Sequence, residues 1–248
     1  MAELISYITA GYPDEKRCVR IAREMAEAGS DVIELGIPFS DPIADGPSIQ
    51  EACSTAIKNG MTPKKALAIA SEIAKSGKRV MLLSYYNSIY SFGLEKFVKL
   101  AKRNGVWAIA IADLPVEESE KFVCACNGNR IKTVFFVAPN TPAERIKDIE
   151  KHTTGFLYML ALFGVTGTRS EISQMTIDAL SRVKKIVKKP VYVGFGISKP
   201  EHVRALAIAG ADGIIIGSAY IEAIKNTPAK AVFGKIRKMV IDFKQATL

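Results

Sequence analysis

The sequence predicts a closed (β/α)8 barrel, and two features of its pattern lead to this fold class. Short apolar runs rich in β-branched residues alternate with longer segments of helical periodicity, eight times and without a linker or a change of composition. Strands that alternate with helices form parallel sheets, because each crossover returns the chain to the same edge. Eight such units in 248 residues fit a single barrel domain over residues 1–248. A doubly wound open sheet is the alternative.

The expected strands are short apolar runs that end at Gly, Pro or polar residues. They cover residues 4–8, 31–35, 79–84, 106–111, 133–137, 156–160, 191–193 and 213–216. The segments between them place apolar residues every three or four positions, as one face of an amphipathic helix requires. These helices are expected over residues 18–28, 48–58, 63–75, 94–103, 116–126, 142–150, 174–187, 200–209 and 219–224, with further helical sequence to 243.

The composition describes a globular chain with a sizeable core, 48% hydrophobic and 24% charged. No apolar run approaches the roughly 20 residues of a membrane-spanning helix, and the first ten residues lack the basic start of a secretory signal. We therefore expect a cytoplasmic protein. The four cysteines fit neither a CxxC pair nor a zinc set, and a metal is not expected. The only histidines are His152 and His202, and a surface position is expected for His202 at the start of its helix.

The net charge is +9, from 34 Lys plus Arg against 25 Asp plus Glu. The basic residues are spread along the chain, and no nucleic-acid-binding signature accompanies them. Nucleic acid is therefore not an expected partner, and attraction of a phosphorylated metabolite is the functional interpretation that remains open.

The segment 34–48 carries three carboxylates close to the end of the second strand. Glu34 interrupts an apolar strand, and alternation turns its side chain away from those of Ile33 and Leu35. A carboxyl in the mouth of a barrel would be desolvated, which raises its pKa and suits it to proton transfer. The alternative is a strand-edge carboxylate paired with a lysine. Asp41 and Asp45, taken singly, are also explained as turn or helix-capping residues.

Glycine-rich loops follow the last three strands. They are residues 163–170, 194–198 and 217–218. In barrels of this kind the loops after strands seven and eight bind phosphate through backbone N–H groups and a helix N-terminus. Each loop alone is also explained by tight turns, but their position at these two strands predicts a phosphate site. The residues thus indicate a barrel enzyme for a phosphorylated small molecule and do not name its reaction.

Several motifs together closely resemble the tryptophan synthase α subunit family. They are Glu34-Leu-Gly-Ile-Pro-Phe-Ser-Asp-Pro-Ile-Ala-Asp-Gly-Pro47, Tyr85-Tyr-Asn87, Ala112-Asp-Leu-Pro115, Ala138-Pro-Asn-Thr-Pro142, Gly164-Val-Thr-Gly167, Gly194-Phe-Gly-Ile-Ser198 and Gly217-Ser218. The resemblance covers nearly the whole chain and implies a carbon–carbon lyase, which cleaves indole-3-glycerol phosphate to indole and glyceraldehyde 3-phosphate by a retro-aldol-like route.

The resemblance also implies a role for each matching position. Glu34 would be the general acid and base at the indole ring carbon, and Asp45 would stabilise or deprotonate the indole nitrogen. The remaining substrate-binding positions would enclose the indole or hold the phosphate; they are Tyr7, Tyr158, Thr166, Gly167, Gly194, Phe195, Gly196, Ile215, Gly217 and Ser218.

A β subunit is the implied partner, in an α2β2 heterotetramer. It would carry the pyridoxal phosphate and join indole to serine, so no cofactor is expected in this chain. The implied β-facing positions are Pro38, Asp41, Pro42 and Asn87. The segments 38–46 and 164–170 resemble the mobile loops of the family, whose closure would expel water from the site.

Two departures from the family accompany the resemblance. Many members carry an extra N-terminal helix that closes the barrel bottom, whereas here the first strand starts almost at Met1, and the charge of +9 is higher than expected. Three other functions are alternatives. A free-standing lyase without a β partner is the main alternative; a different phosphate-binding barrel enzyme would lack the segment 34–47, and an inactive activator subunit would lack Glu34 or Asp45.

Overall fold

Eight parallel strands close into a barrel in the computed structural model, which describes residues 1–162 and 172–248. The strands are β1 (Glu3–Thr9), β2 (Val32–Gly36), β3 (Arg79–Ser84), β4 (Val106–Ile111), β5 (Lys132–Val137), β6 (Leu157–Leu160), β7 (Val191–Gly194) and β8 (Gly213–Ile216). They follow one another around the barrel in chain order, and β1 pairs with β8 to close it. This closure confirms the (β/α)8 barrel and shows that the open-sheet alternative is wrong.

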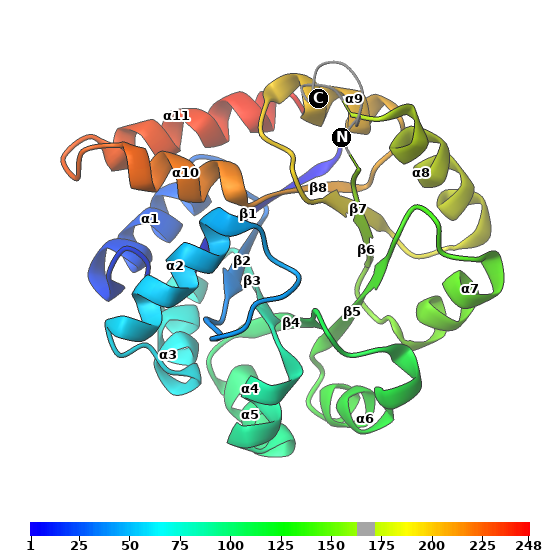
Figure 1. The fold of residues 1–248 in the computed structure, drawn as a ribbon, viewed down its shortest axis with the longest axis horizontal. Coiled ribbons are helices and arrows are strands. Elements are labelled where there is room, and N and C mark those ends of the chain that lie inside the picture. The colour runs from blue at the N-terminus through cyan, green and yellow to red at the C-terminus, as the bar shows by residue number, and fades with distance from the viewer. Residues whose placement is uncertain (163–171) are drawn as a thin grey trace.

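Helices surround the strands on all sides, as Figure 1 shows. They are α1 (Glu15–Glu27), α2 (Pro47–Lys58), α3 (Pro63–Ala74), α4 (Tyr86–Phe92), α5 (Leu94–Arg103), α6 (Glu120–Gly128), α7 (Ala143–His152), α8 (Gln174–Ile186), α9 (Pro200–Ile208), α10 (Ser218–Asn226) and α11 (Val232–Gln245), with a 3-10 turn η1 (Val116–Glu118). Within the two described ranges, none of them is long and apolar enough to cross a membrane.

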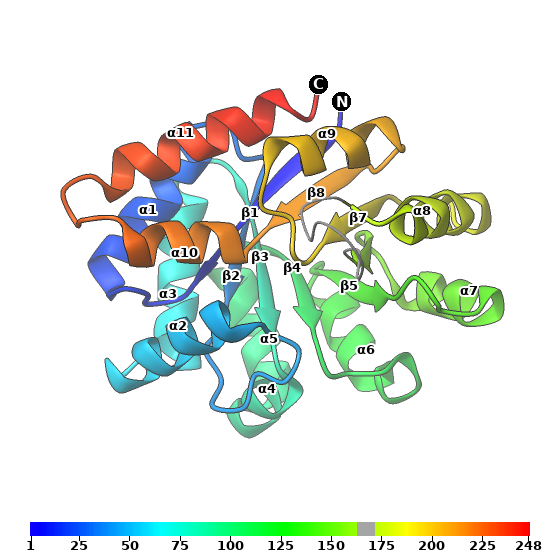
Figure 2. The ribbon, with the colours of Figure 1, turned by 45° about the horizontal axis from the view of Figure 1, so that its top comes forward.

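Local sequence signals explain where several helices begin. The Asp14 side chain accepts the Arg17 N–H at 2.8 Å and caps α1, and Thr62 caps α3 in the same way. Proline occupies the first turn of α2, α3 and α9, where its missing N–H has no partner to lose. In Figure 2 the last helix, α11, lies beside α1, so both ends of the chain meet on one side of the barrel.

The structure differs from the sequence-based expectations at three places. Helix α4 was not expected, because its seven residues bury only Ile89 and are too few to show a period. The expected helix over 116–126 is split, and the Ser119 hydroxyl donates to the Val116 carbonyl at 2.7 Å where η1 ends and α6 begins. The surface position expected for His202 is wrong: its side chain is buried, and Nδ1 accepts the Ser198 N–H at 3.4 Å.

Side chains alternate between the two faces of each strand, so each strand contributes to two cores. One set of side chains packs against the helices, and the other fills the barrel interior in layers. Tyr7 of β1 lies in register with Glu34 of β2, and Phe136 of β5 with Tyr158 of β6. All four are interior positions: the Phe136 ring stacks on Tyr158, and Tyr7, Glu34 and Tyr158 line one common cavity. The side chains expected to carry chemistry therefore converge on one end of the barrel.

An ionic and aromatic cluster fills the opposite, N-terminal end of the barrel. Arg79 of β3 forms a salt bridge with Glu3 of β1, and the Tyr192 hydroxyl donates to the same carboxylate. The Arg79 guanidinium lies 4.7 Å from the centroid of the Trp107 ring. The Phe156 ring stacks on Tyr192 at 4.0 Å. These side chains come from β1, β3, β4 and β7 and from Phe156 just before β6, so they close the barrel bottom around the start of β1.

We expect Arg79→Ala to destabilise the fold by about 1–3 kcal/mol, because it leaves a half-buried carboxylate and removes a cation–π contact. Lys147→Ala is the control, because the Lys147–Glu144 salt bridge joins side chains that are 54% and 84% exposed; its cost should stay below about 1 kcal/mol. Urea unfolding of both variants measures the difference. Equal losses would mean that the cluster does not stabilise the barrel bottom.

Candidate active site

A cavity of about 320 Å³ opens at the C-terminal ends of the strands. Residues from β1, β2, β3, β6 and β8, from the loops after β2, β7 and β8, and from the first turns of α2 and α10 form its wall. They are Tyr7, Glu34, Asp45, Gly46, Pro47, Ser48, Ile49, Leu83, Tyr158, Phe195, Gly196, Ile215, Gly217 and Ser218. Most of the expected catalytic and substrate-binding residues therefore lie around one space.

Glu34 lies deep in this cavity, with 1% of the residue exposed. Its Oε1 atom has no hydrogen-bond partner among the described residues. Burial raises the pKa of the carboxyl to about 8, and the nearby charge of Asp45 acts in the same direction. At neutral pH the group therefore holds a proton that it can donate. The strand-edge position with a lysine partner is wrong, because alternation turns the side chain into the barrel.

Asp45 reaches the cavity from the loop between β2 and α2. The Tyr85 hydroxyl donates a hydrogen bond of 2.8 Å to Asp45 Oδ2. Burial raises the pKa of Asp45, whereas the hydrogen bond from Tyr85 lowers it. Asp45 is not the cap of α2, whose N-cap residue is Gly46. Two carboxyls thus meet in one cavity with different surroundings, the arrangement that separates acid from base.

Aromatic side chains form the wall opposite the loop. The Tyr158 ring stacks on Phe136 at 4.8 Å and meets Phe195 edge to face at 5.8 Å. Burial holds the pKa of Tyr7 and of Tyr158 well above the ordinary tyrosine value, so both hydroxyls stay neutral. Phe195 has a φ of 75°, a left-handed conformation that costs free energy in a non-glycine residue. A flat apolar ligand fits between such rings.

The N-terminus of α10 faces the polar end of the cavity. Gly217 is the N-cap residue, Ser218 is the first residue of the helix, and both line the cavity with Gly196. Free N–H groups at the start of a nine-residue helix, with the helix dipole behind them, favour an anion. A helix N-terminus therefore lies at the place where the sequence predicts the phosphate site.

Some predicted site residues have another place. Thr166, Gly167 and the rest of the segment 164–170 lie outside the described residues. Gly194 does not line the cavity. It allows the Tyr158 ring to pack closely against the backbone, because a Cβ at this position would lie 2.6 Å from Cε2 of the ring. The four partner-facing candidates follow β2 and β3 outside the cavity; Asp41 and Asn87 are exposed, and Pro38 and Pro42 are buried.

Five wall residues were not among the predicted site residues, namely Gly46, Pro47, Ser48, Ile49 and Leu83. Leu83 shares the interior face of β3 with Met81, so strict alternation from a correctly phased strand could have found it. Ser48 and Ile49 open α2, and their direction depends on the path of the preceding loop. That path is a tertiary feature and leaves no signal in the sequence.

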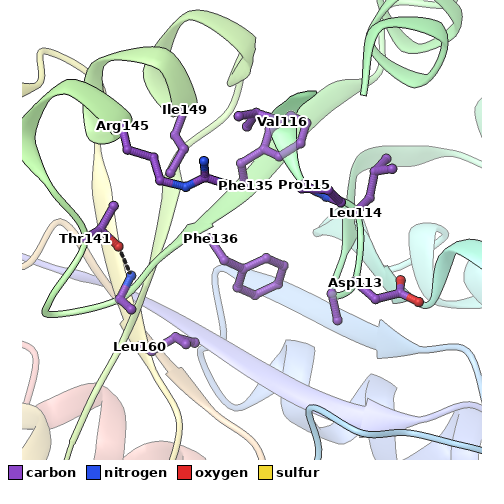
Figure 3. A pocket seen from close by; sticks show the side chains of 12 residues that line it. Asp113, Leu114, Pro115, Val116, Phe135, Phe136, Thr141, Arg145, Ile149 and Leu160 are labelled. Atoms are coloured by element: carbon purple, nitrogen blue, oxygen red, sulfur yellow. Dashed lines mark hydrogen bonds between the residues drawn. The ribbon is translucent and has the colours of Figure 1, made fainter. Parts of the chain in front are cut away.

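A second cavity, of about 340 Å³, lies beside the first and is shown in Figure 3. It opens between the loops after β4 and β5 and helix α7, and the Phe136 ring projects into it. Its two charged groups already have structural partners. Asp113 accepts the Tyr86 N–H at 2.7 Å, and Arg145 forms a salt bridge with Glu117. This cavity therefore lacks the free acid–base pair that distinguishes the first.

Comparison with known proteins agrees with this geometry. The family model of the tryptophan synthase alpha chain matches residues 1–247. The chain belongs to this family. A tryptophan synthase alpha chain from Archaeoglobus fulgidus is 44% identical over 229 residues, 92% of each chain, and one from Pyrococcus abyssi is 46% identical over 89% of each.

Solved structures show the same relationship. A chain of the tryptophan synthase α2β2 complex from Pyrococcus furiosus is similar with a TM-score of 0.92 and 42% identity, over 97% of both chains. One from Mycobacterium tuberculosis tryptophan synthase has a TM-score of 0.89 and 28% identity, covering 99% of this chain and 92% of its own. The membership confirms the expected family, the lyase class and the function of a tryptophan synthase alpha chain, rather than that of a free-standing lyase.

Glu34 should make the stability of this alpha chain pH-dependent. Its pKa is about 8 in the folded chain against an ordinary value of 4.5, so the folded state holds a proton that the unfolded state loses between these values. Stability contributed by the neutral carboxyl is therefore full at low pH and is lost as the pH rises, by at most about 1.4 kcal/mol per unit. Above pH 8 we expect Glu34→Gln to be more stable than the wild type.

Urea unfolding from pH 4.5 to 9 tests this expectation. The advantage of Glu34→Gln should be small at pH 4.5, grow with pH and level off above about pH 8. Glu95→Gln is the control, because the side chain of Glu95 is 81% exposed. A difference between Glu34→Gln and wild type that stays constant across this range would contradict the raised pKa.

Proposed function

We propose that Glu34 and Asp45 together cleave indole-3-glycerol phosphate to indole and glyceraldehyde 3-phosphate in this alpha chain. One observation carries the proposal: a buried, protonated carboxyl and a second carboxylate share a cavity that also contains a helix N-terminus. The cavity thereby offers an acid, a base and an anion site at once. These are the groups that a retro-aldol-like cleavage of a phosphorylated substrate needs.

The substrate has an apolar end and an anionic end, and so has the cavity. Its phosphate would accept hydrogen bonds at the start of α10, from backbone N–H groups beside Gly217 and from the Ser218 hydroxyl. The indole would lie between Phe195, Ile215 and the two buried tyrosines, with its nitrogen toward Asp45. The carbon–carbon bond to be broken then lies over Glu34.

The proton transfers balance with these two groups. Glu34 donates its proton to the indole ring carbon that bears the glycerol chain, and Asp45 stabilises the positive charge that develops on the ring nitrogen. Glu34, now a carboxylate, takes the proton of the neighbouring side-chain hydroxyl. The electrons of the O–H bond form the aldehyde, and those of the carbon–carbon bond restore the aromatic ring. Indole and glyceraldehyde 3-phosphate leave, and Glu34 is protonated again.

The partner is a tryptophan synthase β subunit, in an α2β2 assembly like that of the similar complex from Pyrococcus furiosus. The pyridoxal phosphate belongs to that subunit, and we propose that the alpha chain works without a cofactor of its own. The loop that carries Asp45 inward also exposes Asp41 and 81% of Ile43 outward. This outward face is the proposed contact with the β subunit, beside Asn87.

Two further proposals concern the whole chain. Residues 1–248 form a single barrel domain, in keeping with the family match over residues 1–247. The location is cytoplasmic: the four cysteines Cys18, Cys53, Cys124 and Cys126 are all free thiols, which a reducing compartment preserves.

Indole release from indole-3-glycerol phosphate, with and without a β subunit, tests the reaction. We expect wild-type activity that rises with β, and a loss of several hundredfold or more in Glu34→Gln, which keeps the shape but removes the transferable proton. High activity that β does not change would favour the free-standing lyase. No indole from the wild type in either condition would contradict the proposed reaction.

Asp41→Ala tests the coupling between the loop and the β subunit. Because Asp41 is exposed and faces away from the cavity, its loss should reduce β-stimulated indole release more than basal release. The same comparison in Asp148→Ala, an exposed carboxylate on α7, controls for loss of surface charge. Equal reduction of both activities in Asp41→Ala would mean that the residue acts on the site itself.

A further inference from the structure

Tyr85 is a buried tyrosine outside the set of residues assigned so far. It follows β3 directly and is 3% exposed. Its hydroxyl reaches the loop between β2 and α2 and makes two hydrogen bonds there. It accepts the Ala44 N–H at 3.0 Å and donates to Asp45 Oδ2 at 2.8 Å. One atom thus holds two consecutive residues of the loop.

The ring of Tyr85 contacts the other end of the same loop. It stacks on Phe39, with ring centroids 5.2 Å apart and planes inclined by 25°. Phe39 is the third residue after the end of β2, and Asp45 lies six positions further on. Tyr85 therefore connects the two ends of the loop to β3, a rigid strand of the barrel.

The carboxylate of Asp45 depends on this contact. Among the described residues, the Tyr85 hydroxyl is the hydrogen-bond donor that the structure records for it. The other recorded bonds of Asp45 use its backbone: its N–H donates to the Pro42 carbonyl, and its carbonyl accepts from Gln50. Those bonds shape the turn but leave the direction of the side chain to Tyr85.

We propose that Tyr85 is a positioning residue for cleavage: its hydroxyl fixes the Asp45 carboxylate, and the loop that carries it, where the indole nitrogen binds. The inference rests on the proposed role of Asp45. Because Tyr85 occupies Oδ2, it leaves Oδ1 available for the substrate N–H. A carboxylate held in this way needs no reorganisation when positive charge develops on the ring.

The same hydrogen bond favours the charged form of Asp45. It lowers the pKa that burial raises, whereas Glu34 receives no such bond among the described residues. The other titratable groups around Asp45 are Tyr7, Tyr158 and Cys53. Burial raises the pKa of both tyrosines, and that of Cys53 to about 11, so these three stay neutral where the two carboxyls titrate.

Tyr85→Phe tests the proposal, because it removes the hydroxyl and keeps the ring that stacks on Phe39. In the complex with the β subunit we expect kcat for indole release to fall about ten- to hundredfold, the scale of a misplaced catalytic group, with a smaller change in KM. The acid limb of the pH profile should move to higher pH, because Asp45 then takes up a proton more readily.

Tyr220→Phe is the matched control. Tyr220 is fully buried in α10, and its hydroxyl accepts a hydrogen bond from Ser6 outside the cavity. Both variants lose one buried hydroxyl and should lose similar thermal stability, but only Tyr85→Phe should change kcat and the pH profile. A Tyr85→Phe enzyme with wild-type kcat and pH profile would overturn the proposal, whatever its melting temperature.

A double-mutant cycle with Asp45→Asn tests whether Tyr85 acts through Asp45. In the Asp45→Asn background, Tyr85→Phe should cost little further activity, whereas independent effects would multiply and would contradict positioning. Wild type and Glu34→Gln in the same assay separate this result from the reaction itself. An inactive wild type would count against the proposed function, and an active wild type with an unaffected Tyr85→Phe against the positioning role alone.

Discussion

The rest of the site depends on one constraint: the carboxyl of Glu34 is buried in the mouth of the barrel and is neutral. A parallel strand places every second side chain inside the barrel, and at this position of β2 only 1% of the acidic residue is exposed. Its Oε1 atom has no partner among the described residues, and burial makes the protonated form the stable one. The surrounding rings keep it dry, and a substrate is needed to supply the acceptor for its proton. The acid therefore exists because the site around it is apolar.

The carboxyl of Asp45 is positioned in a different way. Glu34 is fixed by a strand, whereas Asp45 is on a loop and takes its place from Tyr85. That loop presents Asp45 to the cavity and, a few residues away, exposes Ile43 to the outside. A partner that docks on the outer face would therefore contact the same short segment that carries Asp45, the proposed second catalytic carboxylate. Coupling between the partner and the site does not require a chain of intermediate residues, because any shift of this loop also moves Asp45.

The fold and the inward direction of Glu34 could be predicted from the sequence because both follow from a period. Alternating strand and helix patterns gave the closed barrel, and alternation within β2 pointed Glu34 inward. Features that depend on tertiary packing could not be predicted in this way. Helix α4 is too short for a period, and His202 is buried because it accepts the Ser198 N–H from the loop after β7. Tyr85 was visible only as part of a family motif, since its bond to Asp45 joins residues 40 positions apart.

Stabilising contacts and energetically unfavourable features lie at opposite ends of the barrel. At the C-terminal end, Glu34 Oε1 is buried without a partner among the described residues and Phe195 has a φ of 75°, and each feature costs free energy. At the N-terminal end, Glu3, Arg79 and Tyr192 satisfy one another and pack on aromatic rings. Gly213 leaves the space there that the Tyr192 ring fills, since a Cβ would lie 2.7 Å from it. Each strand runs from the end of the barrel that holds the N-terminal cluster to the end that holds the cavity. The cluster therefore fixes the start of strands whose side chains line the cavity. A substitution at the barrel bottom can therefore be felt at the site through strand geometry, without contact to any substrate.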